Sequence, residues 1–148
     1  MKFLSGSVIF MSFAFALASC RLSGADVRVS NNFGICARLP AGVVHAPVDW
    51  GATDFEVTEL FFGATRGTVY VGDFPDFPGF DPDQEFHETS GTVEYIGAAD
   101  EMEISSYLYR VGQGSRSSIH VLVQIPEADI EFNGAWSQGA EKRVLRCS

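Results

Sequence analysis

Hydrophobic and polar residues alternate along several short stretches of the chain, which is the pattern of half-buried β-strands. The clearest case runs from Ile119 to Ile125, where every second residue is Ile or Val and where His120, Leu122 and Gln124 lie between them. Further strands are predicted over Phe33–Leu39, Phe55–Phe62, Thr68–Gly72, Thr92–Ile96 and Glu103–Val111.

Glycine-rich segments separate these strands. Gly63–Gly67 predicts a hairpin loop between two aromatic strands, and Gly112–Ser115 predicts a second hairpin. Within Phe55–Phe62 the apolar phase shifts between Val57 and Leu60, which predicts a β-bulge or a bend.

The C-terminal stretch fits more than one secondary structure. Ile130–Phe132 continues the strand-like alternation, whereas Trp136, Ala140 and Val144 lie on one helical stripe. The last residues, Lys142–Cys147, also fit a strand. The predicted fold class is therefore mainly β: a single antiparallel β-rich domain, sandwich-like or barrel-like, with an α+β variant that contains one short helix left open.

The composition allows one domain with a hydrophobic core. The chain has 148 residues, of which 46% are hydrophobic and 20% charged, and 13 are Phe. Its 19 acidic residues against 10 Lys and Arg give a formal charge of -9. Because nucleic-acid binding needs cations that neutralise phosphates, no nucleic-acid partner is expected. The sequence contains no P-loop, dinucleotide-binding glycine motif, HExxH or paired CxxC, and no cofactor or metal is expected.

The first 19 residues have the pattern of an export signal. Lys2 provides a short positive start, no residue from Phe3 to Ala18 is charged, and Val8–Leu17 forms an apolar core. This core is shorter than the roughly 20 apolar residues that a helix needs to span a bilayer. A secretory signal peptide over residues 1–19 is therefore predicted.

The segment Leu17-Ala18-Ser19-Cys20 resembles the lipobox of bacterial lipoproteins. The resemblance implies that Cys20 takes a diacylglyceryl group, that the signal is cut before it, and that the new N-terminus is acylated, for example with palmitate. Two or more acyl chains anchor a protein stably to a membrane. Arg21 after the cysteine implies a position on the outer membrane, facing the periplasm.

This interpretation divides the chain into three parts: a signal peptide over residues 1–19, a lipidated N-terminus and tether over residues 20–30, and the domain over residues 31–148. Two other cleavage sites stay open, because ordinary signal peptidase fits both Ala16-Leu17-Ala18 and Ser23-Gly24-Ala25.

The two remaining cysteines, Cys36 and Cys147, lie near the two ends of the mature domain. An even pair in an exported chain predicts one disulfide. In the chain-entropy model, closing a loop of about a hundred residues stabilises the fold by roughly 4–5 kcal/mol. Neither cysteine has a His or a second Cys at ligand spacing, so a metal site is not expected.

Acidic residues are concentrated in the middle of the chain. From Gly67 to Tyr109 there are ten acidic residues and no Lys or Arg. Basic residues cluster toward the chain ends, so a disulfide between the ends predicts a basic pole near the anchor and an acidic region away from it. Such a region would attract a cationic protein partner. The alternative is a surface that only keeps the domain soluble.

Residues 73–86 contain three prolines and four phenylalanines, which predicts a long loop. Phenylalanines in a loop are either buried beneath it or available to a partner. The candidate partner-binding residues of this loop are Phe74, Asp76, Phe77, Phe80, Asp81 and Asp83.

No catalytic residues are predicted, and the chain is not expected to be an enzyme. His87 and Glu88 are adjacent, so in a strand they would point to opposite faces. His120 alternates with an apolar face and is expected on the surface or at an edge. A small hydrolase stays open only if His87 or His120 meets a carboxylate and a nucleophile in a cleft.

Two further resemblances concern the domain. Asp54–Val57 together with Val69–Phe77 is similar to a pattern in small exported proteobacterial proteins of unknown role, which implies no activity. Ser90–Tyr95 and Trp136–Glu141 resemble the Ser-Gly-x-x-Tyr and Trp-x-Lys-Gly-x-Glu segments of membrane-bound lysozyme inhibitors. The first has one residue too many, and Gln138 replaces the Lys of the second.

These patterns favour a non-enzymatic envelope lipoprotein, anchored to the membrane by lipid, that serves as a binding or structural module and presents an acidic, aromatic loop. The alternative is an inhibitor or immunity protein against a cationic cell-wall hydrolase such as lysozyme.

Overall fold

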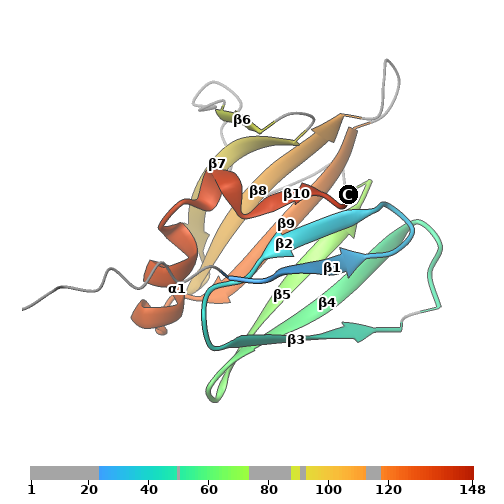
Figure 1. Ribbon diagram of the computed structural model, residues 1–148. Helices are drawn as coiled ribbons and strands as arrows, with labels where there is room; N and C mark the ends of the chain where they lie inside the picture. Colours follow the sequence, from blue (N-terminus) through green and yellow to red (C-terminus); the bar gives the residue numbers. More distant parts are fainter. Residues whose placement is uncertain (1–23, 50, 74–87, 91–92, 113–117) are drawn as a thin grey trace, which may run out of the picture.

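The computed structural model describes residues 24–49, 51–73, 88–90, 93–112 and 118–148 (the backbone only at 88–90 and 118), which form two antiparallel sheets and a short helix (Figure 1). The predicted β-rich, sandwich-like class is confirmed. One sheet contains, in order, β1 (Asp26–Ser30), β2 (Ile35–Arg38) and β10 (Val144–Arg146). The other contains, in order, β3 (Val43–Val48), β4 (Phe55–Phe62), β5 (Thr65–Gly72), β9 (Ser118–Pro126), β8 (Ile104–Gly112), β7 (Val93–Glu101) and β6 (Glu88–Ser90).

The seven-stranded sheet has two ends, which are defined by the residues that pair there. At one end Phe62 pairs with Thr65, and Glu101 pairs with Ile104. We call this the near end, because it is close to where the described chain enters the fold. At this end β1 begins beside the connection that leads from β2 into β3. At the opposite end, the far end, Gly72 pairs with Phe55 and with His120. Because the 8 residues of β5 are joined by seven steps of roughly 3.3 Å, its two ends lie about 23 Å apart.

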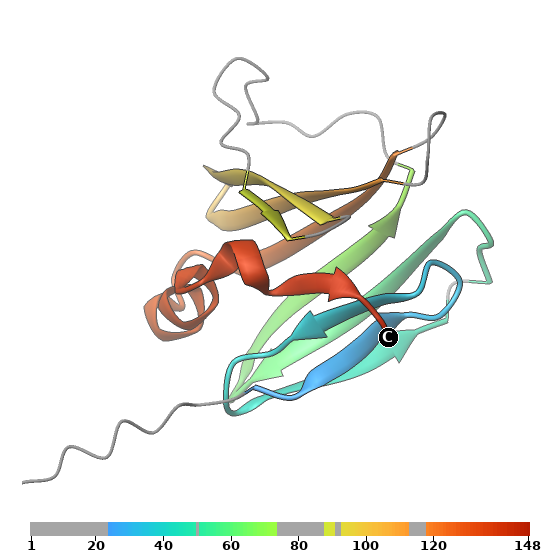
Figure 2. The ribbon, with the colours of Figure 1, turned by 45° about the horizontal axis from the view of Figure 1, so that its top comes forward.

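The three-stranded sheet and helix α1 (Ile130–Ser137) cover the same face of the seven-stranded sheet (Figure 2). Ile35 of β2, Val123 of β9 and Trp136 of α1 are each 0% exposed in the shared core. Burial of large apolar side chains like these is the main favourable term of folding.

Side chains of β4 tie β1 to the larger sheet. The Thr58 hydroxyl donates a hydrogen bond to the Val29 carbonyl at 2.9 Å, and the Ser30 hydroxyl donates to the Glu56 carboxylate. The Asn32 N–H donates to the same carboxylate at 3.1 Å. These contacts satisfy polar groups at the outer edge of β1, which would otherwise lack sheet partners.

The bulge predicted within Phe55–Phe62 is wrong. β4 pairs with β3 and with β5 without a register shift. The apolar phase changes because an inward position is polar: Thr58 is 1% exposed and its hydroxyl is hydrogen-bonded to β1. Register shifts occur instead between Tyr95 and Gly97 in β7, and between Arg28 and Ser30 in β1.

Residues 130–137 form a helix, so the strand-like continuation predicted over Ile130–Phe132 is also wrong. The Asp129 carboxylate accepts a hydrogen bond from the Phe132 N–H at 2.9 Å, which satisfies a donor of the first helical turn. Phe132 and Trp136, about one turn apart, are buried against the sheet. A 3₁₀ turn, η2 (Ala140–Lys142), follows, and β10 then leads to Cys147, so helix and strand occur in succession.

Two tight turns close the near end. Gly63 and Ala64 link β4 to β5, and Gly63 has φ 58°, a conformation that glycine adopts without strain. The predicted hairpin at Gly63–Gly67 is confirmed, with β5 beginning inside it. Met102 and Glu103 link β7 to β8 with φ 52° and 63°, which is the left-handed region that disfavours side chains. β8 and β9 pair as the second predicted hairpin, around residues 113–117.

Candidate functional site

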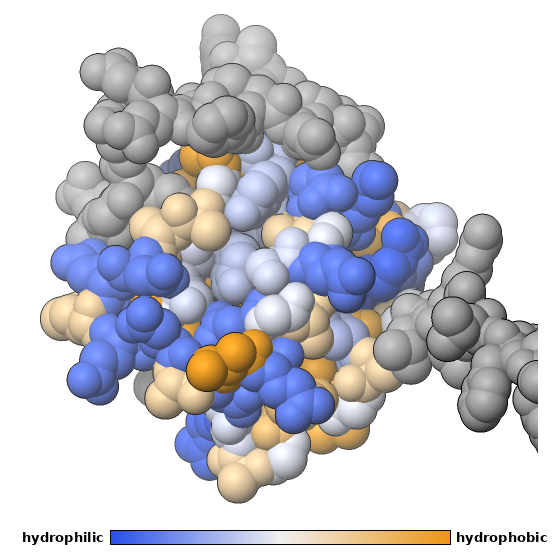
Figure 3. Space-filling model, turned by 90° about the vertical axis from the view of Figure 1, so that its left-hand side faces the viewer, coloured by the Kyte–Doolittle hydropathy of each residue, from blue (hydrophilic) through white to orange (hydrophobic). Residues whose placement is uncertain are grey.

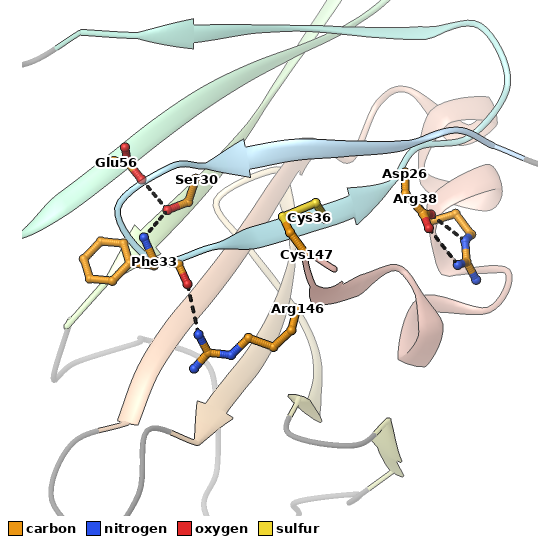
Figure 4. Close-up of a disulfide and its surroundings, with 8 residues drawn as sticks. All are labelled: Asp26, Ser30, Phe33, Cys36, Arg38, Glu56, Arg146 and Cys147. Carbon is orange, nitrogen blue, oxygen red and sulfur yellow. Dashed lines mark hydrogen bonds and ion pairs between the residues drawn. A yellow bond between two sulfur atoms is a disulfide. The ribbon is translucent and has the colours of Figure 1, made fainter.

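The predicted cysteine pair forms a disulfide on the three-stranded sheet. Cys36 lies in β2 and Cys147 follows β10, with an S–S distance of 2.10 Å and a Cα–Cα distance of 5.1 Å (Figure 4). The two residues are 111 positions apart in the sequence. The bond therefore joins the first and last parts of the described fold and acts as a structural crosslink.

Arg146, next to this disulfide, connects the two sheets. Its guanidinium donates to the Phe33 carbonyl at 3.0 Å and to the Gly112 carbonyl at 3.2 Å (Figure 4). The Cys147 N–H donates to the Gly34 carbonyl at 2.9 Å. The C-terminus is thus fixed both to the connection between β1 and β2 and to the far end of β8.

The chain enters the described fold at the near end. Gly24 packs so closely against β2 that a Cβ at this position would lie 1.8 Å from the Leu39 carbonyl oxygen. Two residues later, Asp26 accepts hydrogen bonds of 2.8 and 3.1 Å from the Arg38 guanidinium (Figure 4). Residues 26–30, assigned to the tether from the sequence, form β1. The proposed lipidation site, Cys20, lies outside the described residues.

The six candidate partner-binding residues, Phe74, Asp76, Phe77, Phe80, Asp81 and Asp83, lie outside the described residues. Their attachment points are described. Residues 74–87 follow β5 and precede β6, and both attachment points lie in the far half of the sheet. In the sheet order, β9, β8 and β7 separate β5 from β6.

A row of charged and polar side chains crosses the far half of the sheet next to these attachment points. His120 of β9 pairs in register with Arg110 of β8, which pairs with Glu94 of β7. An Arg110 guanidinium nitrogen lies 3.5 Å from a Glu94 carboxylate oxygen. The pKa of His120 is lowered, first by burial and then by the Arg110 charge, while Asp73 opposes the shift. The His120 imidazole is therefore held in its neutral form.

The hydrolase considered from the sequence stays a prediction, because His87 lies outside the described residues and only the strand register around His120 is described here. Arg110, a cation, is the register partner of His120, and no serine, threonine or cysteine pairs with it on the described strands. Among the described residues, no three His, Cys, Asp or Glu side chains lie close enough together to hold a metal ion.

Among the described residues of the Gly67–Tyr109 stretch, acidic side chains occur at both ends of the sheet and do not form the single acidic region that the sequence predicted. Asp73 lies at the far end, whereas Asp100, Glu101 and Glu103 lie beside the near-end turn between β7 and β8. The Glu127 N–H donates to the Glu103 carbonyl at 2.8 Å, which adds residues of the β9–α1 connection to the same corner. We define the acidic corner by its exposed members: Asp100, Glu101, Glu103, Glu127 and Glu131.

Hydrophilic residues cover much of the described surface seen from the side of α1, with hydrophobic residues scattered among them (Figure 3). The half-buried Asp129, at the start of α1, accepts hydrogen bonds from the Thr65 hydroxyl at 2.5 Å and from the Phe132 N–H. These bonds lower the pKa of Asp129. The Asp129 carboxylate thus joins α1 to β5 through these hydrogen bonds.

The two segments that resemble lysozyme inhibitors each contribute an aromatic side chain that packs in or against the core. The Tyr95 ring packs 5.2 Å from the Tyr109 ring, and burial raises the pKa of Tyr95 to about 12. Trp136 is 0% exposed and its indole N–H donates to the Tyr109 hydroxyl at 3.3 Å. Trp136 is thus inside the core, whereas Tyr95 is partly buried against it.

Arg143 has a structural role that the sequence patterns did not predict. Its guanidinium donates to the carbonyls of Trp136 and Gln138 at 3.0 Å and of Ala135 at 2.5 Å, and also reaches the Arg38 carbonyl at 3.0 Å. It thereby binds the end of α1 to β2. The signal available in the sequence was a basic residue just after a helix, because the last backbone carbonyls of a helix have no partner within the helix.

No protein-family model, curated protein sequence or solved structure shows a significant match to this chain. Within the described residues, no helix has the length and apolar character needed to cross a membrane.

Proposed function

We propose that this chain is a non-enzymatic lipoprotein of the bacterial envelope, anchored through Cys20 to the outer membrane and facing the periplasm. Its role is to present a binding end to a cationic protein partner. The lipobox-like segment before Cys20 supports the anchor, and the Cys36–Cys147 disulfide supports an oxidising compartment outside the cytoplasm.

The observation that carries this proposal is the separation of the chain entry from the candidate loop. Gly24 packs against Leu39 at the near end, whereas residues 74–87 are attached in the far half of the same sheet. Strands that span about 23 Å lie between these ends. An anchor at Cys20 would therefore leave the candidate loop on the side away from the membrane.

The partner class follows from charge. The loop sequence holds several acids and phenylalanines, the described residue that precedes it is Asp73, and the whole chain has a charge of -9. A cationic partner would be attracted by this field, and phenylalanines would supply the apolar contact at the centre of the interface.

Replacement of Cys20 tests the anchor. In cells given labelled palmitate, the native chain is expected to incorporate label and to sediment with outer membranes, and Cys20→Ser is expected to lose both properties. Cys147→Ser is the matched control, because it removes a cysteine but leaves the lipobox intact. Equal incorporation of label by native and Cys20→Ser chains would overturn the anchor.

Crosslinking tests the binding end. A photoreactive residue at Phe77 or Phe80 of the lipidated chain is expected to capture a basic envelope protein, with a yield that falls as salt rises. The same residue at Met102, exposed at the near end, is the control and is expected to capture much less. Equal capture at all three positions would exclude a binding end at the loop.

The inhibitor alternative predicts a different result. The purified protein would slow lysis of cell walls by a cationic muramidase such as lysozyme, and Phe77→Ala and Phe80→Ala would weaken this effect. A chain that crosslinks a basic protein but leaves several muramidases fully active is a binding module and not an inhibitor.

A further inference from the structure

The tether between anchor and domain is much shorter than the sequence suggested. The predicted tether covered residues 20–30, but Gly24 already packs against Leu39 and β1 begins at Asp26. Three residues lie between Cys20 and Gly24, and the four steps from one to the other span at most about 14 Å in a fully extended chain. If Cys20 is lipidated, as proposed above, the near end of the domain is held against the bilayer surface.

The near-end surface beside the chain entry has the composition of a membrane contact. Val44 of β3 pairs in register with Phe61 of β4, which pairs with Arg66 of β5. Val44 is 62% exposed, and the Arg66 guanidinium lies 5.5 Å from the centre of the Phe61 ring. Together with the exposed Ala41 and Gly42, these residues form what we call the near-end rim.

An open groove of about 310 Å³ continues the rim toward the chain entry and is lined by Gly24, Val27, Leu39, Pro40 and Val43, among others. Aromatic and apolar side chains with a nearby arginine are favoured at the boundary between lipid and water. The apolar groups contact lipid there, while the cation reaches the headgroups and water.

The charges beside the rim are balanced. Glu59 lies 3.3 Å from the Arg66 guanidinium, and Asp26 forms the ion pair with Arg38. The Arg66 side chain is 65% exposed, so it can also reach a lipid phosphate. Little repulsion from an anionic membrane is therefore expected at this place.

We propose that the near-end rim rests on the lipid surface that carries the anchor. The rim is small, but a lipid at Cys20 makes the contact intramolecular, and a high effective concentration compensates for weak affinity. The contact fixes the orientation of the domain and keeps the far end directed away from the membrane.

The acidic corner determines the tilt. It lies at the same end of the sheet: its β7–β8 part is separated from the rim on β3–β5 by β9, whereas the β9–α1 connection adjoins β5, where Asp129 accepts a hydrogen bond from Thr65. Anionic headgroups repel this corner. The domain therefore leans with β3 and β4 toward the membrane and with the β7–β8 turn lifted from it.

Fluorescence quenching of the full lipidated protein tests this orientation. With Cys20 acylated and Cys36 bonded to Cys147, the variants Val44→Cys, Met102→Cys and Asp54→Cys each carry one free thiol for a fluorescent label. The proteins are placed in phosphatidylethanolamine–phosphatidylglycerol vesicles that contain brominated lipid. The label at position 44 is expected to be quenched several-fold more than those at positions 102 and 54, both of which stay accessible to iodide.

A charge variant tests the rim itself. Arg66→Glu is expected to reduce quenching at position 44 to the level of position 54, while Thr53→Glu, at an exposed site near the far end, leaves it unchanged. Equal quenching at 44 and 54 in vesicles that bind the protein would overturn the orientation and leave the anchor intact. Failure of the unlabelled protein to carry acyl mass or to float with the vesicles would overturn the anchor instead.

Discussion

At the scale of single residues, the Tyr109 hydroxyl joins the sheet to the segment that covers it. Tyr109 is 0% exposed, donates to the Ala140 carbonyl at 2.7 Å and accepts from the Trp136 indole at 3.3 Å. Both partners lie beyond the last strand of the large sheet, in α1 and η2. A buried hydroxyl with two partners is costly to remove, because each partner is then left without its hydrogen bond.

Tyr109→Phe is expected to lower the free energy of unfolding by about 1–3 kcal/mol, because it leaves the Trp136 indole and the Ala140 carbonyl unsatisfied. Tyr107→Phe is the matched control: that hydroxyl makes only 3.4 Å contacts with Asn133, so a much smaller loss is expected. Urea unfolding measures both changes. Equal losses in the two variants would contradict the role given to Tyr109.

The tyrosines also predict how stability depends on pH. Burial is the first cause of a raised pKa at Tyr70, Tyr95, Tyr107 and Tyr109, and the pKa of Tyr95 rises to about 12. In an unfolded chain tyrosine loses its proton near pH 10. Stability is therefore complete below about pH 10 and decreases as the pH rises toward 12, because only the unfolded chain releases these protons.

Parallel measurements of tyrosinate absorbance and urea unfolding across this range test the expectation. Tyrosinate is expected to form together with unfolding. If it forms near pH 10 in a protein that keeps its full stability, these side chains are not buried as described.

Residue patterns predicted some positions well and others poorly. The alternation in Ile119–Ile125 correctly identified the core face of β9, with His120 on the opposite face. Thr58 could not be identified as a core residue, because its burial depends on the Val29 carbonyl of a strand 29 positions away. The role of Arg143 depends in the same way on where α1 ends relative to β2.

At the scale of elements, the turn between β7 and β8 stores strain. Met102 and Glu103 both have positive φ, a combination that usually requires Asn-Gly. Glu103→Gly is expected to raise the free energy of unfolding by about 1 kcal/mol, since a side chain in the left-handed region costs roughly 1–2 kcal/mol and glycine loses part of that gain to chain entropy.

The control for this prediction is Glu101→Gly, which puts a glycine at the last position of β7 and is expected to destabilise the fold by about 0.5–1 kcal/mol. Thermal and urea unfolding measure both variants. Destabilisation by Glu103→Gly would show that its side chain makes a contact worth more than the strain.

The disulfide is the strongest single link between elements. Cys36→Ser combined with Cys147→Ser is expected to lower the free energy of unfolding by about 4–5 kcal/mol, because the bond closes a loop of 111 positions. The control is Cys20→Ser, which lies outside the described fold and is expected to leave stability unchanged. A loss below about 1 kcal/mol in the double variant would contradict the crosslink.

The elements themselves show where sequence patterns were ambiguous. Ile130–Phe132 alternates like a strand, but the three residues are too few to distinguish a period of two from a helix that buries Phe132 and Trp136. Asp129 was the informative signal, as a helix cap three residues before Phe132. The pairing of Cys36 with Cys147 could be predicted, because with Cys20 assigned to lipid only one pairing was possible.

At the scale of the whole molecule, the central feature is the distance between the chain entry at the near end and the attachment points of residues 74–87 in the far half of the sheet. Strand order could not be predicted, because β5 pairs with β9 and the strands in between fold to one side of that pair. Without this order, neither the short connection from Cys20 to Gly24 nor the far position of the loop attachment could be recognised. The candidate loop was found from composition alone, and its role stays a prediction.

The central claim is that a disulfide-bonded domain is attached directly to a lipid at Cys20. The most direct test is an intact mass of the mature protein from membranes, without and with reductant. The account predicts a chain of Cys20–Ser148 with added acyl groups, whose mass rises on reduction by one hydrogen on each of Cys36 and Cys147. A soluble, unacylated chain that begins at Ser19 or Asp26 would contradict it.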